Sequence, residues 1–382
     1  MKIVHTLPML KKGGGERVAV DLANHAVQQG HEVAILVAHS MDPKLLQDRL
    51  HRDIKILYVS NRTGSMLSKY FCLFSWLLKN RSWLFEQDIL HCHLTFGAVV
   101  GTLTKIFRDI SGRNLPKVFE TYHAVGMTIP TIHRWVHTRL AEHRDALVLM
   151  AEDHYWNAFL SARPNLLSKV IHNGIPLSNE IQVAITEQKA YRRDIGVPDS
   201  CEFVVGTVGR LDPDRQPWLY LPVFAEVARV LGKKVHFVIA GDGTEYNRIK
   251  SLSKDSGLEG KISFPGMVLN QILPCSIMNL YITLNVGSVT GLAALEAAST
   301  ALPVIAIQLY EDYTEKEDHW IWSSTDPMEI AQRIIDLYNS PADRQALGKR
   351  QEKYVHTHYT VDVMAGSYYD LYKRALDNTH TK

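Results

Sequence analysis

The sequence predicts an α/β protein made of two doubly wound domains, each a parallel sheet covered by helices on both faces. Short runs of apolar and β-branched residues alternate with helical patterns, as in βαβ units. The alternation restarts after a polar, irregular stretch around residues 173–200. The length of 382 residues also suits two domains, each large enough for its own core.

The first half opens with a strand over residues 2–5, the loop "LKKGGGER", a helix over 16–29 and the strand "EVAILVA". This order is a βαβ unit. Further strands are predicted at 89–93, 117–123 and 146–151, with helices between them. Because strands alternate with helices in this way, we expect a parallel sheet covered on both faces.

The second half repeats the pattern. Its short β-rich runs are predicted at 203–209, 234–241, 261–266, 280–284 and 302–307, and helical segments separate them. We therefore place an N-terminal domain at 1–172 and a C-terminal domain at 173–355. In open sheets of this kind, ligands bind beyond the carboxyl ends of the strands, so the loops leaving those strands are the places to search.

Composition narrows the class of protein. Hydrophobic residues make up 46% of the chain and charged residues 21%, which is typical of a globular protein. Residues 1–175 carry a net charge of +7 and residues 176–382 carry −5, so the first half is the better partner for an anion, although a solvated basic face is the simpler interpretation. No zinc-finger spacing, RNP-like aromatic motif or basic heptad region indicates a nucleic-acid partner.

Location is indicated by the four scattered cysteines, which lack any C-x-x-C spacing and fit a reducing, cytoplasmic compartment. No apolar run reaches the roughly 18 residues of a membrane span. Residues 70–85 place aromatic and leucine side chains at helical spacing beside Lys79 and Arg81. This segment predicts either peripheral contact with the inner face of the cytoplasmic membrane or ordinary core packing.

Two loops suit phosphate groups. Gly13, Gly14 and Gly15 leave the first strand and open the first helix, so their backbone N–H groups could meet a phosphate or sugar; a plain turn cluster is the alternative. The loop fits neither the dinucleotide fingerprint nor the P-loop pattern. In "GTVGRLDPDRQP", Arg210 and Arg215 follow a strand and suit a diphosphate, unless they only pair with the neighbouring aspartates.

The stretch "NVGSVTGLAALEAAS" follows another strand and predicts a helix that begins near Gly291 or Leu292. Glu296 lies about one turn into this helix among small apolar residues. A carboxylate there can accept two hydrogen bonds from a vicinal diol such as a ribose, whereas a salt-bridged surface glutamate is the alternative.

Together these segments resemble the retaining glycosyltransferases of family 4, which have the GT-B fold. The resemblance covers nearly the whole chain, through "GGGERVAVDLANHAVQQGHEVAIL", "DILHCH", "ETYHAVG", "VIHNGI", "VGRLDPDRQP", "VIAGDG", "FPGMV" and "GLAALEAA" in family order and spacing. It implies two Rossmann-like domains facing across a cleft, with the acceptor on the N-terminal side and the nucleotide-sugar on the C-terminal side. It also implies that residues 356–382 form a helix crossing back to the N-terminal domain.

The resemblance assigns roles to individual positions. His123 matches a histidine that touches the donor sugar near the reaction centre, and Arg210 matches the diphosphate-binding arginine. Arg215 stands where a lysine usually does the same. These three are the predicted catalytic residues. The predicted donor-binding residues are Gly14, Gly15, Gly209, Gly241, Met267, Ser288, Val289, Thr290, Gly291, Leu292 and Glu296.

Two positions depart from the family pattern. Ser288 stands where the family has the first glutamate of its E-x7-E motif, which holds hydroxyls of the donor sugar. Gln308-Leu309-Tyr310 replace an expected glycine pair. The usual donor sugar is therefore not implied for this chain.

The function expected from the resemblance is retaining transfer of a sugar from a nucleotide diphosphate donor to a glycan or lipid-linked acceptor, as in bacterial cell-surface polysaccharide, lipopolysaccharide or glycolipid synthesis. A sugar-nucleotide epimerase of the same fold and an inactive nucleotide-sugar-binding relative are the alternatives. No cofactor or metal is expected. His91 and His93 share one strand face and could bind zinc, but the sequence shows no third ligand.

Overall fold

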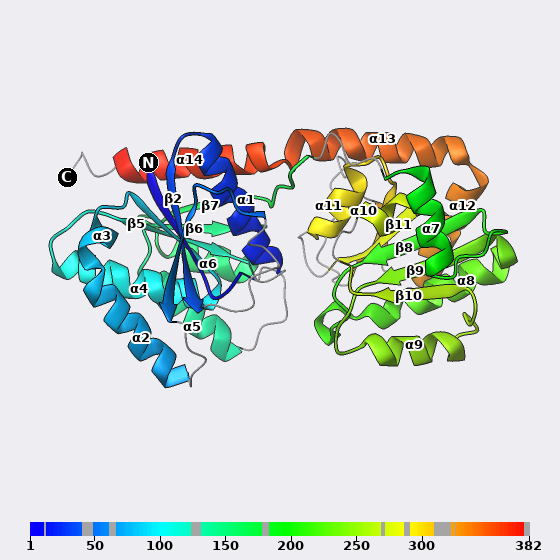
Figure 1. Cartoon of the computed structure of the whole chain (residues 1–382), viewed down its shortest axis with the longest axis horizontal. Coiled ribbons are helices and arrows are strands. Elements are labelled where there is room, and N and C mark those ends of the chain that lie inside the picture. Colours follow the sequence, from blue (N-terminus) through cyan, green and yellow to red (C-terminus); the bar gives the residue numbers. More distant parts are fainter. Residues whose placement is uncertain are drawn as a thin grey trace. The chain divides into compact units, whose positions relative to one another are not determined.

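The computed structural model describes residues 1–10, 13–39, 49–60, 66–123, 131–177, 183–268, 272–285, 291–308, 322–324 and 326–377. The chain forms two compact units. The first comprises Met1–Pro176 with Thr360–Lys382, and the second comprises Leu177–Tyr359. Each unit contains its own parallel sheet, so the predicted α/β class with two doubly wound sheets is confirmed (Figure 1).

The sheet of the first unit has seven strands in the order β3-β2-β1-β4-β5-β6-β7, and all its described pairings are parallel. The central strands β4 and β6 are fully buried, as expected for a parallel sheet that helices cover on both faces. The bounds are β1 Lys2–Leu7, β2 Glu32–His39, β3 Lys55–Ser60, β4 Ile89–His93, β5 Lys117–Tyr122, β6 Ala146–Leu149 and β7 Leu167–Val170.

Helices cover both faces of this sheet. One face packs against α1 and the C-terminal helix α14, and the other packs against α2 and α4 (Figure 1). The bounds are α1 Gly14–Gln28, α2 Met66–Lys79, α3 Arg81–Phe85, α4 Leu94–Ile110, α5 Thr131–Ala141, α6 His154–Ser161 and α14 Val361–Asp377. Helix α14 therefore completes the first unit although it comes from the other end of the chain.

The second unit has six strands in the order β10-β9-β8-β11-β12-β13. They are β8 Phe203–Val208, β9 Val235–Ala240, β10 Ile262–Gly266, β11 Leu280–Asn285, β12 Val304–Gln308 and β13 Trp322–Ser324. The helices are α7 Ile185–Asp194, α8 Tyr220–Leu231, α9 Tyr246–Asp255, α10 Ile272–Ser276, α11 Leu292–Ala298, α12 Pro327–Asn339 and α13 Pro341–His358. A core of side chains from β8, β9, β11, α8 and α12 holds the unit together.

The predicted strands agree with the structure to within a few residues, and β4 agrees at both ends. Strands β3, β7 and β13 were not predicted. Each lies at the edge of a sheet, and β3 and β7 are only partly buried, unlike the central strands.

Among the helices that the structure describes, none has the length and the apolar character that crossing a bilayer requires.

Candidate functional site

The first unit reverses its strand order between β1 and β4. Strands β2 and β3 lie on one side of β1, and β4 to β7 lie on the other. In doubly wound sheets this switch point opens a crevice at the carboxyl ends of the strands. The residues that follow these strand ends include Gly15 in α1, Leu94 after β4 and His123 after β5.

These three residues are in close contact. A Cβ atom built on Gly15 would lie 3.2 Å from Cγ of His123 and 3.2 Å from Cδ2 of Leu94. Leu94 itself has a left-handed backbone with φ of 60°, which is uncommon for a residue other than glycine. Gly15 therefore lies against the ring of His123, and a larger residue would push on it. Gly14, the first residue of α1, is exposed.

A chain of hydrogen bonds joins three histidine rings behind this contact. Nε2 of His123 lies 3.0 Å from Nδ1 of His93, and Nε2 of His93 lies 3.1 Å from Nδ1 of His5. His5 is in β1, His93 ends β4 and His123 follows β5. Because these strands are adjacent and parallel, residues far apart in the sequence meet on one face of the sheet.

A fourth histidine belongs to a second network on the same face. Nε2 of His91 lies 2.8 Å from Oγ1 of Thr121, and its Nδ1 lies 2.7 Å from the hydroxyl of Tyr372 in α14. The hydroxyl of Tyr368 lies 2.8 Å from the same Thr121 oxygen. Both nitrogens of His91 are thus engaged, and α14 supplies two of the partners.

Burial keeps these imidazoles neutral. It lowers the pKa of His5 to about 3 and the pKa of His123 to about 4. The pKa values of His91 and His93 fall well below the ordinary 6.5, first through burial and then through the neighbouring histidines. At neutral pH each ring therefore carries one N–H donor and one acceptor nitrogen.

The sequence showed no third ligand for His91 and His93, and the structure places a candidate beside them, because β1 supplies His5. Within the described part of the chain, ligand nitrogens of His5, His91 and His93 lie within 4.8 Å of one another. Neutral imidazoles are the usual nitrogen ligands of zinc. The sequence carried a signal for this residue, since His5 lies in the first predicted strand, as His91 and His93 lie in β4.

The second unit has its own switch point between β8 and β11. Close backbone packing shapes the turns there. A Cβ atom on Gly241, whose φ is +148°, would lie 1.8 Å from the carbonyl oxygen of Gly209. The N–H of Gly209 donates to the carbonyl of Ala240 at 2.9 Å. Only glycine fits at position 241, and this contact ties the turn after β8 to the turn after β9.

Arg210 leaves β8 directly after this contact, and 52% of its side chain is exposed. It forms ion pairs with Asp212 and with Asp214, the latter at 3.0 Å. Arg215 lies 3.6 Å from the same Asp214 carboxylate. Burial, and then the charge of Arg210, lower the pKa of Arg215. The two predicted arginines therefore share one acidic partner, as the alternative interpretation of this loop expected.

The other predicted donor-binding residues of the second unit lie at α11, after β10 and in the segment before α11. Gly291 caps α11, so the helix begins at Leu292 as expected, and Glu296 is partly buried in its middle. Met267 follows β10, two strands away from β8, and is 65% exposed. Ser288, Val289 and Thr290 lie outside the described residues.

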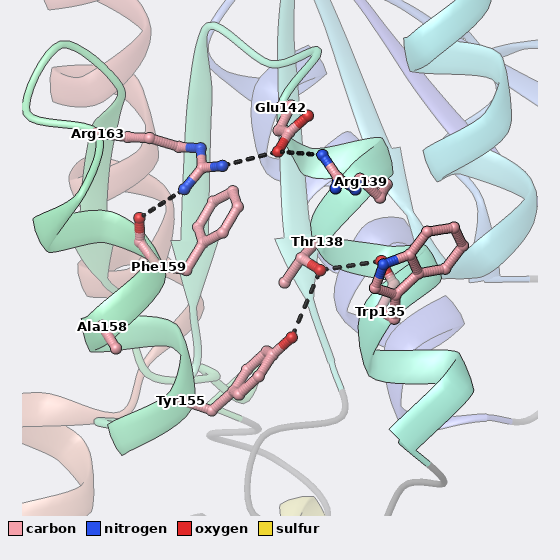
Figure 2. A pocket seen from close by; sticks show the side chains of 8 residues that line it. All are labelled: Trp135, Thr138, Arg139, Glu142, Tyr155, Ala158, Phe159 and Arg163. Carbon is pink, nitrogen blue, oxygen red and sulfur yellow. Dashed lines mark hydrogen bonds and ion pairs between the residues drawn. The ribbon is translucent and has the colours of Figure 1, made fainter.

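A cavity of about 330 Å³ lies elsewhere, between α5 and α6 of the first unit (Figure 2). Arg139 stacks on Trp135 and Arg163 stacks on Phe159, and both guanidinium groups reach Glu142. The remaining lining residues are Thr138, Tyr155 and Ala158. Within the described part of the chain, no residue predicted for the site lines this cavity.

Comparison with known families matches the two halves of the chain separately. Residues 12–179 match the family model described as Glycosyltransferase Family 4, and residues 202–340 match the model described as Glycosyl transferases group 1. The chain is a group 1 glycosyltransferase of the family 4 type. The resemblance found in the sequence is therefore confirmed.

Individual relatives of this glycosyltransferase are distant. A Campylobacter jejuni GalNAc-alpha-(1->4)-GalNAc-alpha-(1->3)-diNAcBac-PP-undecaprenol alpha-1,4-N-acetyl-D-galactosaminyltransferase is 26% identical over 279 residues, covering 71% of this chain and 69% of the relative. The putative glycosyltransferase EpsD of Bacillus subtilis is 23% identical over 282 residues, covering 70% and 72%.

Among solved structures, Anabaena HepE in complex with UDP and glucose superposes with a TM-score of 0.77 at 18% identity. The match covers 97% of this chain and 99% of that chain. At this identity the likeness shows a shared fold, and with the family matches it confirms the GT-B fold class.

Proposed function

We propose that this glycosyltransferase moves a sugar from a nucleotide diphosphate donor to a glycan or lipid-linked acceptor, with retention at the anomeric carbon. The observation that carries the proposal is the pair of guanidinium groups, Arg210 and Arg215, directly beyond the carboxyl end of β8 at the switch point of the second unit.

A diphosphate can replace the carboxylates that now hold these arginines. Exposed ion pairs contribute only about 0–1 kcal/mol, so releasing Arg210 from Asp212 and Asp214 costs little. A diphosphate then offers bidentate, charge-assisted hydrogen bonds to the same guanidinium. Two fixed positive charges also stabilise the diphosphate as it leaves, so the proposed reaction needs no metal ion.

The neutral histidines of the first unit suit the uncharged part of the donor. An imidazole with one donor and one acceptor nitrogen can bind sugar hydroxyl groups without attracting an unwanted counter-ion. We assign this task to His123, whose ring has room because Gly15 carries no side chain. Glu296 is assigned to the ribose diol, and the backbone of Gly291 and Leu292 to the donor phosphates.

The acceptor is proposed to be a glycan or lipid-linked saccharide met at the inner face of the cytoplasmic membrane. The Campylobacter relative is named for a saccharide carried on PP-undecaprenol. In this chain, α2 exposes Phe71 to 75%, together with Phe74 and Leu78. Lys79 ends the helix and Arg81 begins α3, so the apolar face borders cationic groups that suit anionic lipid.

Calorimetric titration with UDP-, GDP- and ADP-sugars tests the donor class. One nucleotide should bind to the wild-type chain, and Arg210→Ala and Glu296→Ala should each weaken its binding. Unchanged affinity in both variants would refute these assignments. NMR analysis of the product then separates retaining transfer from release of an epimer, and binding without turnover over a panel of acceptors would mark an inactive relative.

Vesicle co-sedimentation tests the membrane contact. Binding to vesicles with anionic phospholipid should fall when Phe71 and Phe74 are replaced by serine. Val230→Ser is the matched control, because it removes an exposed apolar side chain from α8 in the second unit. Equal binding by the double variant and the control would contradict a membrane role for α2.

A further inference from the structure

The three linked imidazoles come from three adjacent strands and run inward from the crevice. His123 lies at the outer end, His93 in the middle and His5 at the inner end. His93 uses one ring nitrogen for His123 and the other for His5. The ring of His123 is thus held by a hydrogen bond through Nε2, and Gly15 lies close beside its Cγ and Cδ2 atoms.

This series of hydrogen bonds affects the protonation of the rings as well as their positions, because each bond needs one donor nitrogen and one acceptor nitrogen. A neutral imidazole has a single N–H group, so the role of one nitrogen determines the role of the other. If Nε2 of His123 donates to His93, its Nδ1 is a bare acceptor. If Nε2 accepts, Nδ1 must carry the proton. The tautomers of His5, His93 and His123 are therefore linked.

We propose that His93 and His5 are positioning residues that hold His123 in one ring orientation and one tautomer, so that its Nδ1 meets a sugar hydroxyl with a fixed hydrogen-bonding role. The inference rests on the proposed function, since it deepens the task assigned to His123. Neither residue needs to touch the substrate, because each acts through the next ring in the chain.

Zinc binding by His5, His91 and His93 is the competing explanation of the same cluster. Tetrahedral zinc needs one lone pair from each ring. His91 already uses Nε2 for Thr121 and Nδ1 for Tyr372, and His93 uses both nitrogens for histidine partners. Zinc binding would have to break several buried hydrogen bonds, whereas without zinc the ring nitrogens of His91 and His93 are already hydrogen-bonded.

Amide substitutions separate the two links of the chain. The amide of asparagine lies near the place of histidine Nδ1, and the amide of glutamine lies near the place of Nε2. His93→Asn therefore keeps a partner for His123, while His93→Gln keeps only the partner of His5. We expect kcat to stay within about threefold of wild type for His93→Asn and to fall about tenfold for His93→Gln, the effect of one lost hydrogen bond.

The affinity of both variants for the nucleotide diphosphate alone should stay close to that of the wild type, because the arginines of the second unit hold the diphosphate and His123 does not contact it. Matched controls are His236→Asn and His236→Gln. His236 is a buried strand histidine whose Nε2 lies 2.8 Å from Ser263 in the second unit. These controls should show similar kcat values. Equal losses in His93→Asn and His93→Gln would mean that His93 only fills space, and would overturn the proposal.

Nitrogen NMR of histidine-labelled protein reads the tautomer directly, without activity. The His123 signals, assigned with His123→Gln, should report one tautomer in the wild type and in His5→Asn. They should report a mixture in His5→Phe, which removes the inner end of the chain. A tautomer mixture in the wild type, or a single tautomer unchanged in His5→Phe, would overturn the proposal, as would stoichiometric zinc in the purified protein.

Failure of the proposed function and failure of the positioning role give different experimental results. If the wild-type chain transfers no sugar to any acceptor, the proposed function fails, yet the NMR experiment still decides whether the imidazole chain fixes His123. If transfer is normal but the His123 tautomer ignores His5, the positioning role fails alone.

Discussion

The two switch points have the same sheet topology but differ in charge, one being neutral and the other cationic. In the first unit the strand ends carry buried, neutral imidazoles joined to one another. In the second unit they carry Arg210 and Arg215, which keep their charges beside aspartates at the surface. The same sheet topology therefore supports two kinds of chemistry.

The difference shows that burial sets the charge of a site. Burial lowers the pKa of an imidazole below neutral pH, so the buried ring is uncharged. A guanidinium has a much higher pKa, so it keeps its charge and lies near water and carboxylates. A neutral crevice suits hydroxyl groups, and a cationic one suits a diphosphate. The four predictions that follow probe this contrast, beginning with the largest effect.

Mild acid should destabilise the first unit more than the second. Unfolded histidines bind protons near pH 6.5, whereas burial lowers the pKa of folded His5 to about 3 and of His123 to about 4. The stabilisation that these neutral histidines contribute is thus complete above pH 6.5, and it is lost as the pH falls from 6.5 towards the folded pKa values. Each such histidine lowers the free energy of unfolding by about 1.4 kcal/mol per pH unit.

Hydrogen exchange read by mass spectrometry at pH 7.5 and 5.5 tests this prediction. Peptides from β4 and β5 should lose protection at the lower pH, while those from β8 and β11 should change less. The second unit contributes His236, whose pKa burial lowers to about 4, so its loss should be smaller. Equal loss in both units would contradict the contrast.

Replacement by alanine should have different effects at Gly241, which follows β9, and at Gly15, which lies in the first turn of α1. Gly241→Ala should lower the free energy of unfolding by about 3 kcal/mol, because its Cβ would collide with the backbone of Gly209. Gly15→Ala should lower it by less than about 1 kcal/mol, yet reduce transfer by displacing the ring of His123.

Thermal unfolding and initial-rate assays measure both effects. Gly366→Ala in α14 is the control, since the added Cβ meets no described atom within 4 Å, and it should stabilise the helix by about 0.5–1 kcal/mol. A Gly241→Ala protein as stable as this control would show that the turn after β9 can relax.

Arg210→Ala should weaken donor binding by about 2 kcal/mol, or about thirtyfold, because it removes hydrogen bonds to a charged group. Calorimetry with the nucleotide diphosphate alone is the measurement. Arg229→Ala is the matched control, as it removes an exposed arginine paired with Glu226 in α8 and should leave affinity unchanged. Equal affinities of the two variants would contradict the assignment of Arg210 to diphosphate binding.

Asp214→Asn should tighten donor binding by about 0.5 kcal/mol, or roughly twofold, because it releases Arg210 and Arg215 from an exposed competitor. Asp255→Asn in α9 removes the same charge from another exposed position and should have no comparable effect. Weaker binding in Asp214→Asn would show that the aspartate orients the arginines and does not compete with the donor.

The sequence predicted the central strands because buried parallel strands are rich in apolar and β-branched residues, as in β8 and β11. It did not predict β3, β7 or β13. These strands lie at sheet edges, where one side lacks a neighbouring strand and the composition is less constrained. Their pairing depends on neighbours that are distant in the sequence.

By itself the sequence determined which loops leave buried strands, and thereby which positions to propose, among them Gly15, His123 and Arg210. Such signals are local, since strand pattern and turn glycines lie within a few residues of each other. Only the tertiary structure decided that His5 and His93 reach His123. That contact depends on the parallel register of β1 and β4, and burial in the assembled sheet, which no local stretch encodes, makes the rings neutral.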